Sequence, residues 1–313
     1  MTADAVHVFA PAKLNLFLHV LGRRPDGYHE LETVFCLLDY GDWLDLEWRP
    51  AGVIERLTPL PGVTEEQDLC VRAARLLAAE SGVQAGVAIR LDKRLPVGGG
   101  LGGGSSDAAA MLLGLNRLWQ LGWSRERLQA IGLRLGADVP VFVFGQAAFA
   151  GGVGELLQPV RLTPAWYLVL VPDVHVSTAA VFANGELTRD SKSIRMTDFV
   201  DRALAGAFGV EPGAEPGLGQ DTGVTPASLM QATRNDLQAV VCAMFPPVAR
   251  CIDWLGQYAE ARMTGSGACV FAVFEVEQQA RQVLANVPAG MSGFVARGLL
   301  RHPQADWALD TGF

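Results

Sequence analysis

Residues 96–106 read Pro-Val-Gly-Gly-Gly-Leu-Gly-Gly-Gly-Ser-Ser, and six of the seven residues from Gly98 to Gly104 are glycine. A β-prone segment over residues 87–91 precedes this stretch, and an Ala- and Leu-rich segment predicts a helix over residues 107–119. Because glycine lacks a Cβ atom, successive backbone N–H groups can turn toward one bound anion. The first N–H groups of the helix and its dipole favour the same anion. The stretch predicts a phosphate-binding loop, with Ser105 and Ser106 as helix caps or hydroxyl donors.

Other interpretations of this loop fit less well. The pattern G-x-G-x-x-G occurs at Gly98, Gly100 and Gly103, but a dinucleotide-binding fold places it on its first strand-to-helix turn, and here a long β-rich region comes first. A Walker P-loop requires Gly-Lys-Ser/Thr, whereas Ser105 follows Gly104 directly. A flexible linker would not be embedded between two regular elements.

The composition is that of a globular protein with a sizeable core. The chain has 313 residues, which suggests about two domains of roughly 150 residues each. Hydrophobic residues make up 50% and charged residues 19%, which excludes a disordered chain. Glycine contributes 35 residues, where average usage would give about 22. The loop at 98–104 accounts for part of that excess.

The net charge and the cysteine content indicate which partners the protein binds and in which cellular compartment it lies. A formal net charge of −8 disfavours nucleic acid as a partner, although local backbone donors can still bind a small anion. The five cysteines lack C-x-x-C spacing and are interpreted as reduced thiols packed as small hydrophobes. No apolar stretch is long enough to span a bilayer, and no signal-peptide pattern is present. We expect a soluble, cytoplasmic protein that binds neither nucleic acid nor membrane.

Strands and helices alternate along both halves of the chain. In the first half, the sequence predicts strands over residues 6–10, 14–20, 33–38, 44–48, 87–91 and 139–144. It also predicts a turn at 40–42 and a helix over 68–80. In the second half, the sequence predicts strands over 167–171 and 269–274 and a turn at 263–268. The helices predicted there cover residues 236–244, 247–258 and 277–286. The alternation predicts two α/β-type domains, residues 1–165 and 166–313. Residues 206–226 are rich in Gly and Pro and predict a flexible insertion.

Three motifs, in order along the chain, resemble those of the GHMP kinases, which include galacto-, homoserine, mevalonate and phosphomevalonate kinases. They are Pro-Ala-Lys-Leu-Asn-Leu at residues 11–16, the glycine loop at 96–106, and Thr-Gly-Ser-Gly-Ala at 264–268. The resemblance implies an α+β fold with two domains. The N-terminal domain is expected to bind the nucleotide and to resemble ribosomal protein S5. The C-terminal domain is expected to be a ferredoxin-like substrate domain, with the active site in the cleft between the two domains.

Two further motifs narrow the resemblance to one branch of the family. Arg-Pro-Asp-Gly-Tyr-His at 24–29 and Gly-Ala-Asp-Val-Pro at 136–140 are similar to the branch that phosphorylates the 2-hydroxyl of 4-diphosphocytidyl-2-C-methyl-D-erythritol, in non-mevalonate isoprenoid synthesis. Two alternatives are a GHMP kinase for another alcohol, such as mevalonate or homoserine, and a non-catalytic nucleotide-binding sensor. Residues 24–29 disfavour a kinase for another alcohol, because mevalonate and homoserine carry no cytosine ring to be bound. The presence of both Lys13 and Asp138 disfavours a non-catalytic sensor.

The resemblance assigns the catalytic roles to Asp138 and Lys13. A carboxylate within hydrogen-bond reach of the substrate hydroxyl can accept its proton as it attacks the γ-phosphorus. Without the resemblance, Asp138 would be interpreted as a turn or helix-cap residue. Lys13 begins an apolar strand and needs an anionic partner there, and pairing with Asp138 would keep that carboxylate ionised.

The resemblance implies ATP as co-substrate, with Mg²⁺ held mainly by phosphates and water. The residues implied to bind ATP are Lys93, Pro96, Val97, Gly98, Gly99, Gly100, Leu101, Gly102, Gly103, Gly104, Ser105 and Ser106. Near Asp68 the family often carries asparagine, which can both donate and accept toward adenine, whereas an ionised aspartate only accepts. The five histidines are scattered along the sequence, and no dedicated metal site is expected.

For the cytidyl substrate, the resemblance implies contacts from both halves of the chain. Tyr28 and Phe182 are expected to sandwich the pyrimidine ring, and His29 to bind its polar edge. The residues implied to hold the rest of the substrate are Asn15, Thr178, Gly265 and Ser266. The expected partners are these two small molecules, and the expected assembly is a monomer or a weak homodimer.

Overall fold

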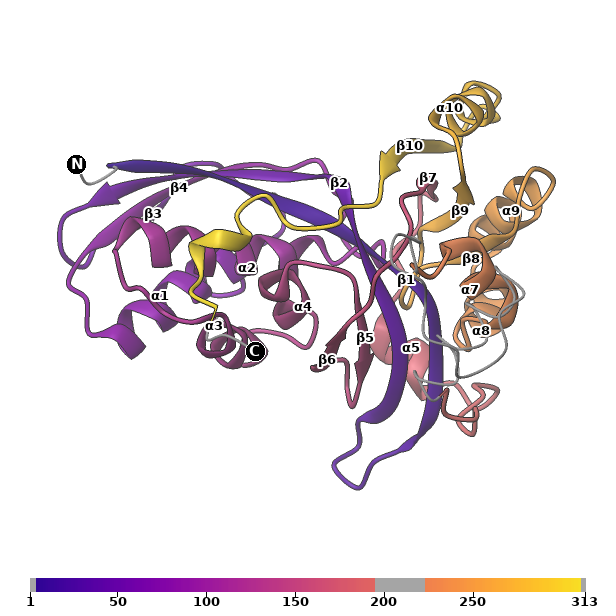
Figure 1. Ribbon diagram of the computed structural model, residues 1–313, viewed down its shortest axis with the longest axis horizontal. Coiled ribbons are helices and arrows are strands. Elements are labelled where there is room, and N and C mark those ends of the chain that lie inside the picture. Colours follow the sequence, from indigo (N-terminus) through magenta and orange to yellow (C-terminus); the bar gives the residue numbers. More distant parts are fainter. Residues whose placement is uncertain (1–3, 195–222, 311–313) are drawn as a thin grey trace, which may run out of the picture.

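The computed structural model describes residues 4–194 and 223–310. Its first sheet has six strands in the order β3-β4-β2-β5-β6, with β1 paired along β2. The elements of this half are β1 (Ala5–Arg23), β2 (His29–Arg49), β3 (Ile54–Arg56), α1 (Leu69–Ser81), β4 (Gly86–Asp92), α2 (Gly103–Leu118), α3 (Arg125–Leu133), α4 (Val139–Phe144), β5 (Ala148–Gly151) and β6 (Leu156–Pro159). Helices α1 to α4 gather beside this sheet (Figure 1).

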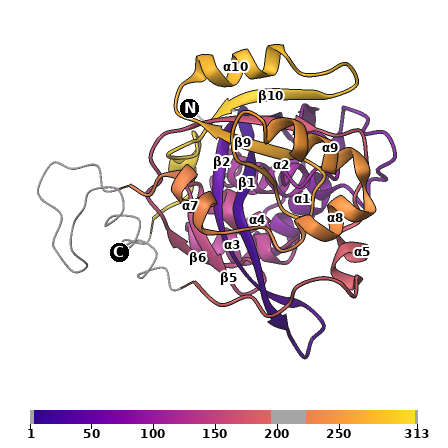
Figure 2. The ribbon, with the colours of Figure 1, turned by 90° about the vertical axis from the view of Figure 1, so that its right-hand side faces the viewer.

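The second sheet has four strands in the order β10-β7-β9-β8. The elements of this half are β7 (Trp166–Val171), α5 (Thr178–Ala183), α7 (Pro226–Ala232), α8 (Gln238–Met244), α9 (Pro246–Leu255), β8 (Ala261–Met263), β9 (Val270–Phe274), α10 (Glu277–Ala285) and β10 (Ser292–Arg297), followed by a short 3-10 turn at Ala305–Trp307. Figure 2 shows this group in front of the β1–β2 pair. Among the described residues, all strand pairs in the two sheets are antiparallel except β3 with β4, which confirms the α+β class.

Strand β1 passes through all three hydrophobic cores. Val8 lies in the core under α1 to α4, Leu14 in the core between the sheets, and Val20 in the core under α8 and α9. Successive side chains of a strand point to opposite faces. Ala12, Leu14 and Leu16 are buried in the core, so the intervening polar residues at 13 and 15 are directed to the other face.

The predicted turn at residues 40–42 is wrong, because β2 continues through it. Gly41 pairs with Pro11 of β1, and Pro11 does not interrupt its own strand either. A Cβ atom on Gly41 would lie 2.1 Å from the Ala10 carbonyl oxygen. Glycine is therefore needed at this position for the close approach of two strands.

The strand predicted over residues 139–144 is also wrong, because the segment forms helix α4. Pro140 lies in its first turn, and Gly145 ends it in the left-handed conformation with φ of 77°. Residues 139–143 are all buried. A short apolar run that is buried on every side shows no periodicity, so its sequence does not distinguish a strand from a helix.

Residues 206–222 of the predicted insertion lie outside the described residues. At its end, Val224 is buried and forms a parallel bridge with Leu162, and the Thr225 side chain caps α7. The last residues of that segment therefore belong to the folded structure. In the part of the chain that the structure describes, no helix combines the length and apolar character needed to cross a membrane.

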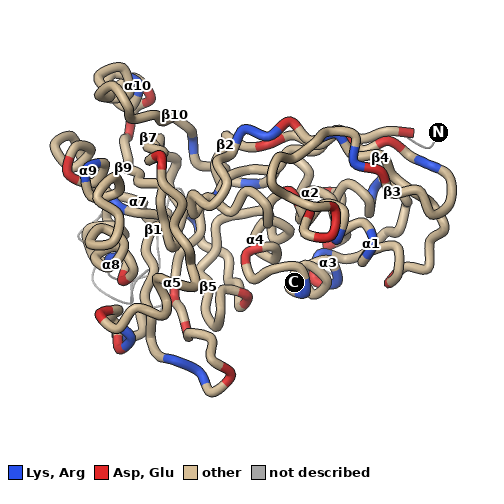
Figure 3. The backbone as a smooth tube through the Cα atoms, turned by 180° about the vertical axis from the view of Figure 1, so that it is seen from behind, with Lys and Arg blue, Asp and Glu red and all other residues tan. Residues whose placement is uncertain are grey.

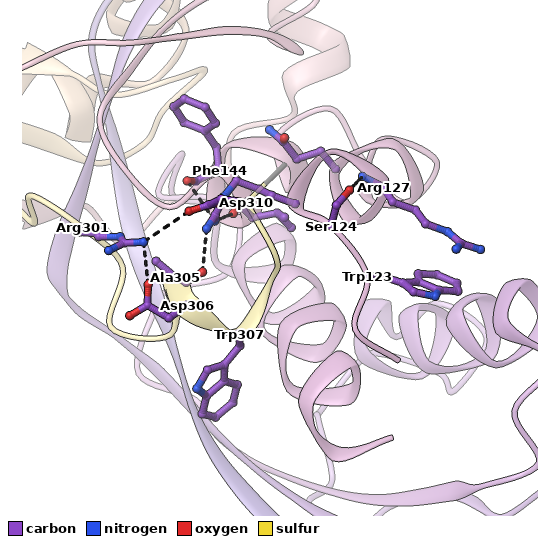
Figure 4. Close-up of polar contacts among 12 residues, drawn as sticks. Trp123, Ser124, Arg127, Phe144, Arg301, Ala305, Asp306, Trp307 and Asp310 are labelled. Carbon is purple, nitrogen blue, oxygen red and sulfur yellow. Dashed lines mark hydrogen bonds and ion pairs between the residues drawn. The ribbon is translucent and has the colours of Figure 1, made fainter. Parts of the chain in front are cut away.

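Residues 298–310 leave the second sheet and return to the first half of the molecule. The Leu299 N–H donates to the Leu37 carbonyl oxygen at 2.8 Å, and the His302 N–H donates to the Gly145 carbonyl oxygen at 2.7 Å. Arg125 of α3 binds the same tail through the Ala305 carbonyl oxygen and Asp310. Figure 4 shows the tail beside α3, with ion pairs from Arg301 to Asp306 and Asp310. The predicted division at residue 165 stays a prediction, but this tail packs on the first half.

We expect His302 to make the fold sensitive to acid. Its side chain is buried, Nδ1 accepts from the Gln304 N–H, and burial lowers its pKa from 6.5 to about 4. The unfolded chain takes up this proton below about pH 6.5, and the folded chain only below about pH 4. The free energy of unfolding therefore falls as the pH drops through this window, by up to about 3 kcal/mol from this group.

Chemical denaturation of the wild type and of His302→Gln between pH 4 and 7.5 tests this expectation. The variant should lose stability less steeply with falling pH. His7→Gln is the matched control, because the His7 side chain is 57% exposed. Equal slopes for the wild type and His302→Gln would contradict the assignment.

Candidate active site

A cleft of about 1200 Å³ lies between the two halves. It is lined by most of the residues that the sequence singled out, namely Lys13, Asn15, Tyr28, His29, Lys93, Pro96, Val97, Gly98, Gly99, Gly100, Gly102, Gly103, Gly104, Ser105, Asp138, Thr178, Phe182, Gly265 and Ser266. The two that do not line it, Leu101 and Ser106, are buried. Residues more than 200 positions apart in the sequence thus meet at one site.

The glycine loop is fixed between the two halves by its own backbone. The Lys13 N–H donates to the Leu101 carbonyl oxygen, and the Cys269 N–H donates to the Gly99 carbonyl oxygen, both at 3.0 Å. Gly100 has φ of +78°, and a Cβ atom there would lie 2.3 Å from the Thr264 carbonyl oxygen. The loop can pass this close to residue 264 only because residue 100 has no side chain.

Helix α2 begins at Gly103, earlier than the predicted residue 107. Gly102 precedes it in the left-handed conformation, and the Ser106 N–H donates to the Gly102 carbonyl oxygen. Ser105 and Ser106 lie inside the first turn and neither residue is the N-cap. The helix therefore starts within the glycine run, which puts its unpaired N–H groups beside the loop, as anion binding requires.

Asp138 and Lys13 meet at the edge of the cleft. Lys13 Nζ lies 3.3 Å from Asp138 Oδ2, with side-chain exposures of 4% and 35%. Asp138 occupies the N-cap position of α4, but its side chain makes no cap hydrogen bond. The carboxylate is thus accessible from the cleft and neutralised by a buried lysine.

Asn15 connects this pair to the second half of the molecule. Lys13 Nζ donates to Asn15 Oδ1 at 2.6 Å, and Asn15 Nδ2 donates to Thr33 Oγ1 at 3.0 Å. The Asn15 N–H donates to Thr264 Oγ1 at 2.9 Å. Thr33 and Thr264 were not predicted as separate site residues, although Thr264 opens the third motif.

Lys93 was expected to bind ATP, but the structure gives it two acidic partners. Its Nζ lies 2.6 Å from Asp42 Oδ2 and 2.7 Å from Asp107 Oδ2. Burial alone would lower the pKa of Lys93, but the two carboxylates outweigh it and raise that pKa. Burial also raises the pKa of Asp107, against the effect of Lys93. The sequence did not reveal this cluster, because Asp42 and Lys93 are far apart in it.

The Lys93 cluster anchors both ends of the glycine loop. Asp42 Oδ1 also accepts from the N–H groups of Arg94 and Leu95, just before the loop. Asp107 follows the loop in the first turns of α2. Lys93 therefore ties the strand before the loop to the helix after it.

Asp68 is paired within the protein. Its Oδ1 accepts from the Cys70 N–H at the start of α1, and its Oδ2 pairs with Arg56. The residue lines the cleft but is buried. Both carboxylate oxygens have a partner in the protein, and contact between Asp68 and adenine stays a prediction.

Aromatic residues lie at the far end of the cleft. Phe182 of α5 stacks on His29, with ring centroids 4.8 Å apart, and Tyr28 is 66% exposed. The sandwich of Tyr28 and Phe182 stays a prediction. Thr178, at the start of α5, has its Oγ1 2.7 Å from Ser266 Oγ, so the predicted substrate residues of both regions are in contact.

The charges around the site are mixed. Basic and acidic residues are interspersed along β2, β3 and β4 (Figure 3). Within residues 4–194 and 223–310, no group of three or more His, Cys, Asp or Glu side chains is arranged to hold a metal ion. The features that suit an anion are the backbone N–H groups of the loop and of α2.

The chain is similar to known proteins over almost its whole length. Residues 68–146 match the family description "GHMP kinases N terminal domain", and residues 225–293 match "GHMP kinases C terminal". It is 57% identical to the 4-diphosphocytidyl-2-C-methyl-D-erythritol kinase of Thiobacillus denitrificans, covering 95% of this chain and 97% of that one. Identity to the enzyme of the same name from Aromatoleum aromaticum is 53%, covering 95% of each chain.

A solved structure agrees with these relatives. The crystal structure of a 4-(cytidine 5'-diphospho)-2C-methyl-D-erythritol kinase superposes with a TM-score of 0.75 at 32% identity, covering 94% of this chain and 100% of that one. The glycine loop, the Lys13–Asp138 pair and the two-sheet fold are therefore found in a chain that is similar to these kinases over almost its whole length. The chain belongs to the GHMP kinases and, within them, to the family of 4-diphosphocytidyl-2-C-methyl-D-erythritol kinases.

Proposed function

We propose that the chain transfers the γ-phosphate of ATP to the 2-hydroxyl of 4-diphosphocytidyl-2-C-methyl-D-erythritol, giving the 2-phosphate and ADP. The observation that carries this proposal is the Asp138 carboxylate, 3.3 Å from Lys13 Nζ, in the cleft that the glycine loop lines. The names of relatives at 57% and 53% identity support the choice of substrate. No observation favours mevalonate, homoserine or a purely sensory role.

Asp138 is the general base of this proposal. It accepts the proton of the 2-hydroxyl as that oxygen attacks the γ-phosphorus. Lys13 pairs with this carboxylate and adds positive charge near the transferring group. Asn15 accepts from Lys13 Nζ and so fixes where that ammonium points.

The donor phosphates lie on the glycine loop and the start of α2 in this proposal. Two buried oxygens there, Ser106 Oγ and Asp107 Oδ1, have no hydrogen-bond partner among the described residues. Mg²⁺ prefers oxygen ligands, so these groups suit an ion that enters with ATP. When bound, Mg²⁺ would neutralise charge that develops on the phosphates.

The cytidyl end of the substrate lies beside Tyr28, His29 and Phe182 in this proposal, and Thr178, Gly265 and Ser266 line the path toward Asp138. We further propose that the protein is cytoplasmic and acts as a monomer or weak homodimer on these two small molecules. The two halves, divided near residue 165, would supply the nucleotide and substrate sides of the cleft.

A coupled assay of ADP release tests the proposed substrate. Turnover is expected with ATP and 4-diphosphocytidyl-2-C-methyl-D-erythritol, and none above background with ATP and mevalonate or homoserine. Turnover with mevalonate or homoserine alone would reject the proposed acceptor while leaving the kinase chemistry in place.

Asp138→Asn is expected to lower kcat by about 100-fold or more, because a positioned base contributes roughly 10²–10⁴-fold. The KM for ATP should change by less than about threefold, since the amide keeps the shape of the side chain. Asp253→Asn, on the exposed side of α9, is the matched control and should leave both constants unchanged. A kcat near the wild-type value for Asp138→Asn would remove this residue as the base.

Gly100→Ala is expected to raise the KM for ATP about tenfold or more, because the new methyl group displaces the loop from residue 264. Gly290→Ala is the matched control. Residue 290 also has a positive φ, +88°, but a Cβ atom there would meet nothing within 4 Å. Both variants pay the left-handed conformational cost of about 1 kcal/mol, and only Gly100→Ala should impair ATP binding. Equal KM values in the two variants would contradict the role given to the loop.

A further inference from the structure

Arg189 lies at the aromatic end of the cleft and is held there by backbone oxygens. Its Nη2 donates to the carbonyl oxygens of Phe182 at 2.8 Å and Asn184 at 2.7 Å. Its Nη1 donates to the Leu187 carbonyl oxygen at 3.1 Å. These contacts fix the guanidinium against the turn that follows α5, so the direction of its Nε–H group is fixed as well.

The Nε–H group of Arg189 faces a histidine ring. Arg189 Nε lies 3.3 Å from His29 Nε2. A guanidinium has no lone pair to offer and can only donate, so the ring nitrogen that faces it must be the unprotonated one. A neutral His29 therefore carries its proton on the other nitrogen.

The surroundings of His29 favour the neutral ring. Burial, Arg189 and Arg23 all lower the pKa of His29. Stacking on Phe182 holds the plane of the ring. Within residues 4–194 and 223–310, no group hydrogen-bonds to Nδ1 of His29, and both His29 and Arg189 line the cleft. The Nδ1–H group is thus a donor that the protein leaves for a ligand.

We propose that Arg189 is a positioning residue that sets the tautomer of His29, so that His29 offers an N–H donor and selects cytosine over uracil. This inference rests on the proposed function. Cytosine N3 carries a lone pair and accepts such a bond, whereas uracil N3 carries a hydrogen. A donor facing a donor leaves both groups unpaired, which costs roughly tenfold in affinity or more.

The tautomer is measured without any substrate. In ¹⁵N NMR spectra of the imidazole groups, with the His29 signal identified by its loss in His29→Gln, the wild type should show an unprotonated Nε2 and a protonated Nδ1. In Arg189→Met the Nε2-protonated form should appear and the pKa of His29 should rise. Arg23→Met is the matched control. It removes a charge that acts on the same ring, so it should raise the pKa but keep the tautomer.

Base selection is measured by calorimetric binding of CDP and UDP. The wild type should bind CDP about tenfold or more tightly than UDP, and in Arg189→Met this preference should fall below about threefold. Binding of ATP by Arg189→Met, which depends on the distant glycine loop, checks that the variant is folded.

The outcomes separate the two proposals. A protonated Nε2 in the wild type, or an unchanged tautomer in Arg189→Met, overturns the role of Arg189. The expected tautomer with equal binding of CDP and UDP overturns base selection. If ATP binds but neither CDP nor UDP does, both the proposed substrate and the proposed base selection are wrong. The NMR result then decides independently whether Arg189 sets the tautomer of His29.

Discussion

The pairing of β1 with β2 is the constraint on which the rest of the structure depends. Its register runs from Ala5 opposite Glu47 to Arg23 opposite His29, with irregularities between Pro11 and Lys13 and between Asn15 and Leu18. These irregular stretches border Lys13 and Asn15, the two polar residues of β1 that line the cleft. The same strand contributes side chains to three cores, so both halves of the molecule are placed relative to Lys13. The backbone N–H of Lys13 also holds the glycine loop, and its side chain meets Asp138.

The two lysines near the loop have different roles because they have different partners. Lys13 shares its ammonium between Asn15 and Asp138, which is partly exposed to the cleft. Lys93 lies between Asp42 and Asp107, both buried, and still lines the cleft. A chain with a net charge of −8 can therefore present positive character to phosphates through backbone N–H groups and one lysine, while another lysine serves the fold.

The sequence predicted the parts of this site that depend on local chemistry. A glycine run between a strand and a helix predicted the loop, and short motifs pointed to Lys13 and to the turn at 263–268. Asp138 was predicted only through the family resemblance of residues 136–140. Contacts between distant segments could not be predicted this way. Asp42 and Lys93 meet only because β2 and β4 pair, and Arg189 follows α5 in a segment without periodicity. Helix α4 was missed because burial on all sides removes the alternation that distinguishes strands from helices.

The tail over residues 298–310 has a consequence for how the protein is made. It donates to Gly145, the residue that ends α4, and Asp138 stands at the other end of that short helix. Domains that emerge first from the ribosome generally fold first. Here the first half lacks its last packing partner until residues near 310 have been synthesised. The helix that begins after Asp138 gains its contact with the tail only then, so a nascent chain that already holds the whole glycine loop would still lack this contact.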